Sequence, residues 1–436
     1  MSDDPELSAE SAVAKDSSSG SSYDVLRLRD FRYYLIGRFV AALGQQMLIV
    51  AVDWELYERT GSPLALGFVG LSQMVPMVLC TLPAGHMADS FNRKRIILAT
   101  TLLLTLASVG LTLVSILHGP VGWIYFFLVL IGIARTFLWP ASASFLPHLV
   151  PRHLFARAVA FNSATFQISS VAGPALSGLV IYLAAKHMSS PAALVYAFDA
   201  VASLVCFSLM LLIRREHHGK PEPLSFGNLA AGFRFVFQNR IILGTITLDM
   251  FAVLLGGATA LLPIFAKDVL GRGAEGLGFL RAAMPIGAVI CALVLAHRGT
   301  LQKAGASMLW AVAAFGAGTI VFGLSQWFWL SFVMLFLCGV ADNVSVIVRQ
   351  TLVQLLTPDE KRGRVSAVNS LFIGTSNELG GFESGLVAHL LGPAMGNTIA
   401  TGAVLAVVTG GIGTILVVIA VALIWPEIRK YGRLDA

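Results

Sequence analysis

The sequence predicts an all-α membrane protein with twelve transmembrane helices in two pseudo-symmetric six-helix bundles. Of the 436 residues, 56% are hydrophobic and only 12% are charged, and the mean hydropathy is +0.78. Soluble globular domains do not have this composition. An internal repeat and an uneven distribution of positive charge are the other two observations that support this fold class.

The second half of the chain repeats the first. Residues that match at an offset of 207 are Pro151 and Pro358, Arg157 and Arg364, Ala160 and Ala367, Asn162 and Asn369, Ser163 and Ser370, Gly173 and Gly380, and the runs 177–180 and 384–387. Many solute transporters are built from two fused halves, with the substrate site at the seam between them. The repeat therefore makes transport the leading hypothesis.

Twelve apolar stretches are long enough to cross a bilayer, for which a helix needs about 20 residues. Their expected ranges are 33–57, 65–88, 95–117, 121–145, 158–186, 192–213, 241–266, 276–297, 306–325, 328–352, 365–391 and 400–425. They divide the chain into an N-terminal bundle over 25–213 and a C-terminal bundle over 241–428. Between the bundles, a polar linker over 214–240 contains an amphipathic stretch at 229–237, which can lie on the membrane surface.

Positive charge is concentrated on one side of the predicted topology. With the N-terminus inside, 22 of the 30 Lys and Arg fall in cytoplasmic segments, and four fall outside: Arg59, Lys186, Lys267 and Arg272. This positive-inside bias predicts that both termini are cytoplasmic. It also accounts for the net charge of +6 by contact with anionic lipid headgroups, so we expect no nucleic-acid partner.

The two ends of the chain are expected to be cytoplasmic tails, at 1–24 and 429–436. The first is rich in serine and acidic residues, has no apolar period, and is predicted to be disordered. It lacks the apolar core of a cleaved signal peptide.

The loop between the second and third spans carries Gly85, Asp89, Arg93 and Lys94 in the run 85–95. The glycine permits close helix contact, and Asp89 can pair with Arg93 or cap a neighbouring helix. The run resembles the loop motif G-x-x-x-D-R-x-G-R-[RK] of the major facilitator superfamily, with Ser90 and Asn92 where Arg and Gly are usual. The resemblance implies a cytoplasmic gate that closes when the transporter faces outward. An ordinary positive-inside loop is the alternative.

The fifth span contains Gly173, Pro174, Ser177 and Gly178. A proline bends the helix, and small residues let a facing helix approach closely. The run 169–178 resembles the G-x-x-x-G-P-x-x-G-G element of the exporter branch of the same superfamily, with serines in place of two glycines. The resemblance implies a kink that helps to seal the cavity and favours export. A kink that serves packing alone is the alternative.

Charged residues within spans are costly, at roughly 2.5–3.5 kcal/mol each at the helix centre. Arg135 in span four and Asp342 in span ten occupy equivalent repeat positions with opposite signs. The resemblance places both spans at the central cavity and an Arg in span four of many proton-coupled antiporters. We expect Arg135 to sense a nearby carboxylate whose protonation changes with substrate. The alternative is a fixed ion pair with Asp342 or another acid.

Other intramembrane residues complete the candidate pathway. A low dielectric disfavours the charged form of a carboxyl group, so Asp249 in span seven and Glu378 in span eleven are the next proton-carrier candidates after Asp342. Trp139, beside Pro140, is a candidate cavity residue. Helix-end solvation or structural pairing is the alternative for each acid, Asp199 and Glu383 included, and especially for Asp53 and Glu55, which can reach the outer interface. Arg38, Arg281 and Arg349 lie near span ends or can pair with these acids, and we assign them no role.

Enzymatic chemistry is not indicated. The sequence has no nucleotide-binding loop, no nucleophile elbow and no Cys/His metal spacing. The four cysteines all lie in predicted spans, where they can pack as small apolar residues. We therefore expect no metal and no cofactor, with a proton gradient as the energy source.

The whole chain from about 25 to 430 is similar to major facilitator superfamily transporters, and three stretches resemble the enterobactin-exporter-like branch of bacterial efflux proteins: 53–62, 229–235 and 357–364. The resemblance implies a monomeric, proton-coupled exporter of the bacterial inner membrane that carries a siderophore or a hydrophobic drug. Two alternatives are an importer or uniporter of the same fold and a non-transporting membrane sensor or assembly partner.

Overall fold

The computed structural model describes residues 23–214, 233–298, 303–394 and 398–432, and within these ranges the chain contains helices and no strand. The first half consists of η1 (Asp24–Arg27), α2 (Arg29–Thr60), α3 (Pro63–Ser90), α4 (Arg93–Ile116), α5 (Val121–Leu149), η2 (Arg152–Leu154), α6 (Phe155–Ala184) and α7 (Ala192–Leu212). The second half consists of α9 (Arg240–Leu255), η3 (Ala258–Leu261), α10 (Leu262–Ile264), η4 (Phe265–Val269), α11 (Gly273–Arg298), α12 (Ala304–Leu324), α13 (Phe328–Leu356), α14 (Asp359–Ala394), α15 (Ile399–Ile424) and α16 (Pro426–Lys430).

Within the described residues, eleven helices are long and apolar enough to cross a membrane, and one further helix is long enough but more polar. The twelfth is α14, whose 36 residues include the polar Asn377, Glu378 and Glu383. It packs against α3, α9 and α15, so neighbouring helices surround much of it. An interior position explains how this helix tolerates a polarity that a lipid-facing helix could not.

The seventh span differs from the continuous helix expected over 241–266. Helix α9 ends at Leu255, and a 3-10 turn and a π-helical turn follow before residue 270. A Cβ atom added to Gly257 would lie 2.5 Å from the carbonyl oxygen of Gly380. The break thus lies where the chain approaches the backbone of α14, and tertiary packing of this kind leaves no periodic signal in the sequence.

The two halves have the same internal packing, as the repeat predicts. In the first half α3 packs on α5, α4 on α5 and α7, and α2 on α6 and α7. The corresponding pairs of the second half are α11 with α13, α12 with α13 and α15, and α9 with α14 and α15. Between the halves, α3 packs against α14, and α6 packs against α11 in the equivalent arrangement.

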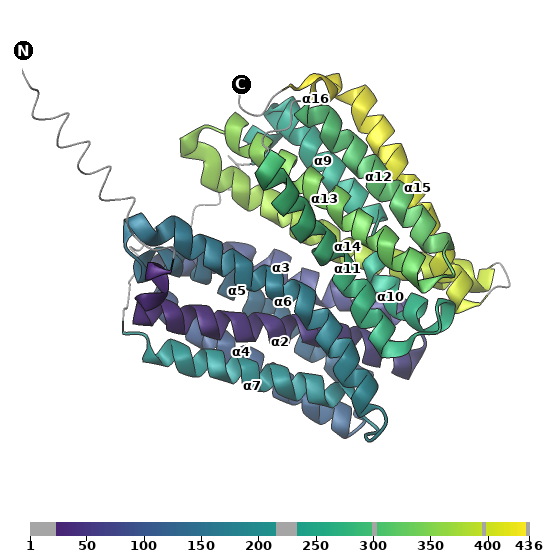
Figure 1. Ribbon diagram of the computed structural model, residues 1–436, viewed down its shortest axis with the longest axis horizontal. Coiled ribbons are helices and arrows are strands. Elements are labelled where there is room, and N and C mark those ends of the chain that lie inside the picture. Colours follow the sequence, from purple (N-terminus) through teal and green to yellow (C-terminus); the bar gives the residue numbers. More distant parts are fainter. Residues whose placement is uncertain (1–22, 215–232, 299–302, 395–397, 433–436) are drawn as a thin grey trace, which may run out of the picture.

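The halves approach each other most closely at one end of the molecule, here called the joined end, which includes residues 60–63, 184–192 and 269–273. A Cβ atom added to Gly178 of α6 would lie 2.4 Å from the carbonyl oxygen of Ala274, and one added to Gly385 of α14 would lie 2.7 Å from that of Pro63. Figure 1 shows the two sets of helices converging near α10 and diverging toward the opposite, terminal end, where the described chain begins and ends.

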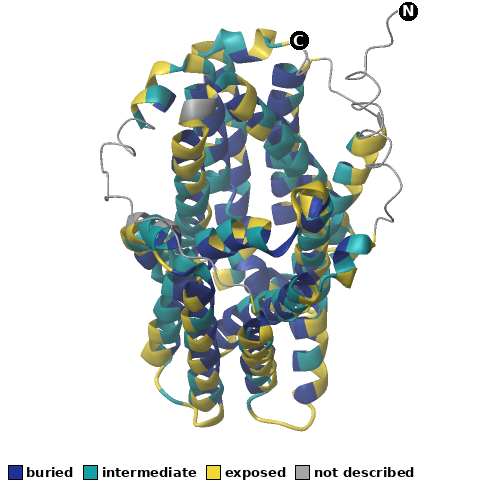
Figure 2. Cartoon of the chain, turned by 90° about the vertical axis from the view of Figure 1, so that its left-hand side faces the viewer, coloured by how far each residue is buried: buried dark blue, intermediate teal, exposed yellow. Residues whose placement is uncertain are grey.

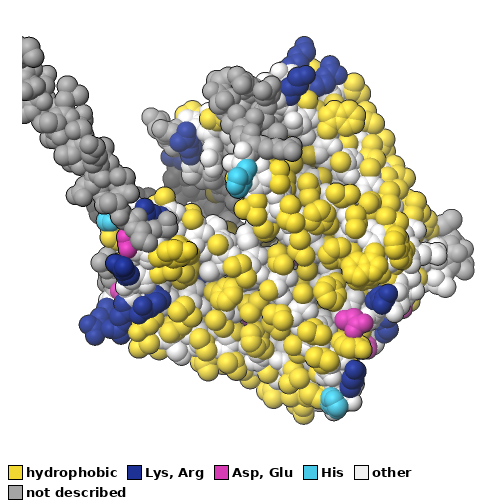
Figure 3. Space-filling model, in the orientation of Figure 1, with side chains coloured by type: hydrophobic (Ala, Val, Ile, Leu, Met, Phe, Trp, Pro, Cys, Tyr) yellow, Lys and Arg dark blue, Asp and Glu magenta, His cyan; other side chains and the backbone are white. Residues whose placement is uncertain are grey.

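The molecular surface has the character expected of a membrane protein. Figure 3 shows a wide apolar face over the helices of both halves, with Lys, Arg, Asp and Glu gathered near its margins. Exposed apolar side chains along the spans include Leu106, Val201, Leu293 and Leu416. In Figure 2 the buried residues face the interior of the bundles and many exposed residues face outward. The protein is therefore a multi-pass membrane protein with a lipid-facing apolar belt.

Local signals set several helix boundaries. Helix α2 ends at Gly61, whose φ of 58° is left-handed, and Pro63 begins α3. The side chain of Asn92 accepts hydrogen bonds from the backbone N–H groups of Lys94 and Arg95, at 3.0 and 3.3 Å. The Asn92 that departs from the family motif is therefore the N-cap of α4.

The predicted tails and linker are only partly described. Residues 1–22, most of the linker and residues 433–436 lie outside the described ranges. Residues 233–238 are helical, at the end of the predicted amphipathic stretch. Within the predicted N-terminal tail, Asp24 belongs to η1. In the C-terminal tail, the carbonyl oxygen of Gly432 accepts a hydrogen bond of 3.0 Å from Ala304 at the start of α12, so this tail is attached to the second half.

Candidate functional site

The seam between the halves carries a cluster of four charged side chains, two from each half. Arg281 of α11 donates to Asp53 of α2, with 2.7 Å between Nη2 and Oδ2. Glu378 of α14 lies within electrostatic range of Arg135, Asp53 and Arg281. Two cations and two carboxylates thus share a mostly apolar region, where mutual neutralisation lowers the cost of burying them. We call these four residues the seam cluster.

Arg135 reaches the seam from α5. Its Nη1 donates to Oε1 of Gln73 on α3 over 2.8 Å, and both side chains line a small pocket. The other lining residues, from α2, α3 and α5, are Gln45, Leu48, Ile49, Val52, Val69, Leu128 and Ile131. Gln73 is a neutral hydrogen-bond acceptor and does not neutralise the guanidinium. Arg135 can therefore still pair with a carboxylate or an anionic ligand.

Asp342 is not the partner of Arg135. Among the described residues no ion pair joins them, so a fixed pair between these two repeat-equivalent residues is not formed in this conformation. The carboxylate in the field of Arg135 is Glu378. Repeat positions predict equivalent places in the two bundles, but they do not predict which side chains meet across the seam.

Asp342 instead belongs to a second cluster inside the C-terminal half. Arg349 of α13 pairs with Asp249 of α9 at 3.0 Å, and both side chains are buried. The same guanidinium donates to Oδ1 of Asn369 over 3.3 Å. Asp342 lies within electrostatic range of both Asp249 and Arg349. Two carboxylates therefore share one cation, and a proton can supply the missing positive charge.

Trp139 lies one turn beyond Arg135 on α5 and is 68% exposed. Arg135, Trp139, Ala143 and Pro147 are all exposed at intervals of four residues, so they share one face of the helix. Trp139, the predicted cavity residue, therefore lies on the same exposed face of α5 as Arg135, one turn closer to the terminal end.

Further contacts join the halves at the joined end. The Tyr57 hydroxyl of α2 donates to Asp268 of η4. The ammonium group of Lys267 lies over the rings of Trp54 and Tyr57, at 5.9 and 5.8 Å from their centroids, a cation–π geometry. Within the first half, Arg59 pairs with Glu55 at 3.1 Å. The contacts of Asp268 and Lys267 with α2, together with the pair between Asp53 and Arg281, must break if the joined end is to open.

The predicted gate loop has a different environment. A Cβ atom added to Gly85 would meet no atom of the described chain within 4 Å, so the predicted close helix contact is absent in this conformation. Arg93 donates to the carbonyl oxygens of Ala88 and Ser144, each over 3.1 Å. Lys94 donates to the carbonyl of Ile213 over 2.6 Å. The Asp89 side chain lies outside the described part of the chain.

The Gly-Pro element of α6 contacts a helix on each side. Ser177 donates to the carbonyl oxygen of Met47 over 2.8 Å, and a Cβ atom added to Gly173 would lie 2.5 Å from Cβ of Gln46, both on α2. On its other side, an added Cβ at Gly278 of α11 would lie 2.6 Å from the carbonyl oxygen of Pro174. The element therefore packs α6 between the two halves, and it contributes to the joined end.

Arg281 and Arg349, to which the sequence assigned no role beyond possible pairing with the intramembrane acids, do pair with two of them: Arg281 with Asp53 and Arg349 with Asp249. A signal was present, since an arginine inside a predicted span is costly and needs a partner. Which acid pairs with which arginine could not be identified from the sequence, because Asp53 is more than 200 residues from Arg281.

Comparison with known proteins gives a consistent family. The sequence model described as Major Facilitator Superfamily matches residues 34–381. Curated relatives named enterobactin exporter EntS include one from Shigella boydii, 26% identical over 404 residues, and one from Shigella flexneri, 25% identical over 413 residues. In each case the match covers 92% of this chain and 93% of the relative.

Solved structures support the same fold. A bacterial homologue of the human lysosomal transporter Spinster, in an inward-facing and unoccupied conformation, aligns with a TM-score of 0.70 at 15% identity, over 92% of this chain and 99% of the other. The POT family transporter PepTSo aligns with a TM-score of 0.72 at 14% identity, over 92% and 98%. At these identities the likeness concerns the fold alone.

Proposed function

The chain belongs to the Major Facilitator Superfamily, whose members are transporters and not enzymes, and we propose that it is a proton-coupled exporter of a small organic molecule, most specifically a siderophore, in the bacterial inner membrane. The seam cluster carries this proposal, because it places a cation and a carboxylate from opposite halves beside a pocket. Similarity to enterobactin exporters over nearly the whole chain supports the direction and the substrate class.

The terminal end is cytoplasmic in this proposal, because the positive-inside bias puts both termini there. The joined end is then periplasmic, and the conformation faces inward. Alternating access consists of rocking the two bundles about the seam, so that the joined end opens as the terminal end closes.

Coupling is proposed to reside at Glu378. When Glu378 is ionised, its charge lies within electrostatic range of the Arg135 guanidinium across the seam. In this state Arg135 can bind an oxygen of the substrate, while the Glu378 carboxylate accepts a hydrogen bond from a substrate hydroxyl. A proton on Glu378 removes that acceptor, so proton and substrate each weaken the binding of the other, and opposite movement follows if the two occupy the site in turn.

Arg135 and Trp139 also suggest the chemistry of the substrate. A guanidinium pairs with oxygen anions and acidic phenols, and an exposed indole one turn away can stack on an aromatic ring. This combination suits an aromatic, oxygen-rich molecule such as a catecholate siderophore. A hydrophobic drug is the second candidate. The proposed protein acts as a monomer in the lipid bilayer and needs no cofactor beyond the proton gradient.

Proteoliposomes holding the purified protein test this function. With an imposed pH gradient, we expect a catecholate siderophore to drive proton flux and to move against its own gradient. Glu378→Gln should uncouple the two fluxes, and Arg135→Gln should reduce substrate affinity roughly tenfold or more, since a charge-assisted hydrogen bond contributes about 1.5–3 kcal/mol.

The matched control is Glu383→Gln, an acid on the same helix that lies near Ser384 and outside the seam cluster. It should keep coupled transport. Downhill movement in either direction without proton flux would instead support a uniporter or importer of the same fold. Absence of transport for siderophores and for lipophilic cations would contradict the exporter proposal and favour a membrane sensor.

A further inference from the structure

A buried carboxyl group in the N-terminal half lies outside the seam and, within the described part of the chain, has only neutral partners. Asp199 of α7 has an exposed fraction of 0%. Its carboxyl oxygens contact Nε2 of Gln45 on α2, at 3.0 and 3.2 Å, and Oγ of Ser108 on α4, at 2.5 Å. Both partner side chains are neutral. Asp53 and Asp249, in contrast, each pair with an arginine.

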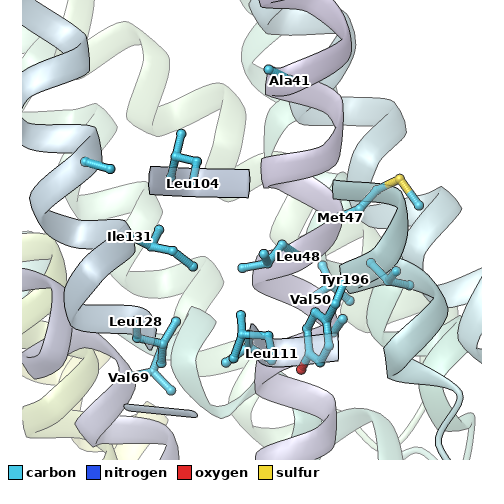
Figure 4. Close-up of a cluster of buried hydrophobic side chains, with 14 of the residues drawn as sticks. Ala41, Met47, Leu48, Val50, Val69, Leu104, Leu111, Leu128, Ile131 and Tyr196 are labelled. Atoms are coloured by element: carbon cyan, nitrogen blue, oxygen red, sulfur yellow. The ribbon is translucent and has the colours of Figure 1, made fainter. Parts of the chain in front are cut away.

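The helices packed around Asp199 are almost free of charge at this level. Helix α7 carries no other Asp, Glu, Lys or Arg, α4 carries none beyond Arg95, and α6 carries none beyond Arg157. On α2 the nearest charged residues are Arg38 and Asp53, each about two turns away. Apolar side chains enclose the region, with Leu104 and Leu111 of α4 on either side of Ser108, as Figure 4 shows for the surrounding cluster.

Isolated charge in such a place is unfavourable by several kcal/mol, and such a group ordinarily neutralises. Ser108 and Gln45 accommodate either form of the carboxyl group, because a hydroxyl can donate or accept and the amide can donate to a carboxylate or a carboxylic acid. The site can therefore hold a proton and release it without rearrangement of its two partners.

Polar atoms lead from this site toward the joined end. One turn away on α7, the Tyr196 hydroxyl is buried beside the carboxyl group of Glu55 on α2, close enough for a hydrogen-bonding and electrostatic interaction between them. In the other direction along α7, Ser203 Oγ is buried without a partner. Unpaired buried polar atoms are the usual partners of internal water.

Gln45 connects the site to the pocket. Its side chain lines the same pocket as Arg135 and Gln73, while its amide nitrogen contacts Asp199 behind the pocket wall. A change of charge at Asp199 therefore acts directly on Gln45, a residue that lines the pocket.

We propose that Asp199 is a second proton-binding site, reached from the joined end past Glu55 and Tyr196 and linked to the pocket through Gln45. This rests on the proposed proton coupling for its role in transport, but binding of the proton itself does not. When the proton is bound, Gln45 is held by a neutral acid. When it is released, the carboxylate holds the Gln45 amide more tightly and away from the pocket.

Infrared difference spectroscopy of the purified protein over a pH titration tests the proposal without any substrate. We expect a carboxylic C=O band that is lost in Asp199→Asn, shifted in frequency in Ser108→Ala, and kept in the control Glu383→Gln. Ser108→Ala retains the carboxyl group, so it remains informative even if Asp199→Asn does not fold.

A band that shows no response to either substitution would overturn the proposal. Displacement of the band by Na⁺ at constant pH, but not by K⁺, would also overturn it and identify a metal-cation site made of the same oxygens. Since neither readout depends on transport, a failed transport assay with a positive infrared result would reject the exporter function and leave the proton site in place.

Discussion

The joined end and the terminal end of this transporter differ in what holds the two halves. At the joined end, glycines bring backbones together, and Asp53 with Arg281 and Tyr57 with Asp268 link opposite halves. Near the terminal end, a Cβ atom added to Gly85 would meet no described atom within 4 Å. Arg93 and Lys94 donate hydrogen bonds to carbonyl oxygens of their own half.

The comparison shows that the two ends hold the halves differently. The joined end combines backbone proximity with a buried ion pair, which is sensitive to a proton or a substituted side chain. At the terminal end, Arg93 and Lys94 are hydrogen-bonded to carbonyl groups of their own half. Substitutions at the two ends should therefore have unequal effects.

The largest effect is expected when the buried pair across the seam is broken. Arg281→Ala leaves Asp53 buried without its partner, and removal of one member of a buried pair costs about 3–5 kcal/mol. The joined end should open in most molecules, as measured by the distance between spin labels on Ser189 and Gln326, which are exposed in loops of opposite halves.

Two controls accompany this change. Exchange of the charges, with Asp53→Arg and Arg281→Asp together, should restore part of the closure. Arg240→Ala breaks an exposed pair with Glu427 within one half and should change the distance little, because exposed pairs contribute about 0–1 kcal/mol. An unchanged distance in Arg281→Ala would mean that this pair does not hold the joined end.

A smaller effect is expected at the glycine contacts. In Gly178→Ala the new methyl group would lie 2.4 Å from the carbonyl oxygen of Ala274, and such overpacking costs about 1–3 kcal/mol. The same distance measurement should show a partial shift toward the open joined end. Gly122→Ala, where an added Cβ meets nothing within 4 Å, is the matched control. Equal behaviour of the two variants would contradict a role for close backbone contact.

A still smaller effect is expected from the loss of a single hydroxyl group at the joined end. Tyr57→Phe removes the hydrogen bond to Asp268, and we expect a change of about 1 kcal/mol, or roughly fivefold in the ratio of the two conformations. Tyr33→Phe is the control, because its hydroxyl accepts from Arg29 within the same helix. A shift of similar size in both variants would assign the effect to the hydroxyl in general and not to this gate.

The smallest effect in the present conformation is expected at Gly85. A Cβ atom added there meets no described atom within 4 Å, so Gly85→Leu should fold with unchanged thermal stability. It should still hinder closure of the terminal end, and therefore slow transport, if the resemblance to the family loop extends to its role. Melting temperature and proteoliposome transport measure the two parts separately, and normal transport would remove Gly85 from the gate.

Much of the architecture could be predicted from the sequence. The repeat placed Gly178 and Gly385 at equivalent positions, and in the structure both bring opposite halves into contact. Hydropathy identified the spans, because every crossing helix must bury its backbone in lipid or protein. Helix α14 was identified despite its polarity, because its 36 residues exceed the roughly 20 that a span requires.

Pairing between helices could not be predicted. Arg135 contacts Gln73 and lies within electrostatic range of Glu378, not of Asp342, and Asp53 pairs with Arg281, because these arrangements depend on how the helices rotate and cross. The break after α9 depends likewise on the approach of Gly257 to α14. Sequence patterns specify which face of a helix is polar, whereas the identity of the partner is set by tertiary packing.

The most direct test of this account measures both ends in one preparation. In a cysteine-free background, spin labels on Ser189 and Gln326 report the joined end, and labels on His153 and Gln354 report the terminal end. As pH is lowered, or in Arg281→Ala, the account predicts that the first distance increases while the second decreases. If the two distances change in the same direction, or only one of them changes, the two halves do not rock about the seam and the central claim is wrong.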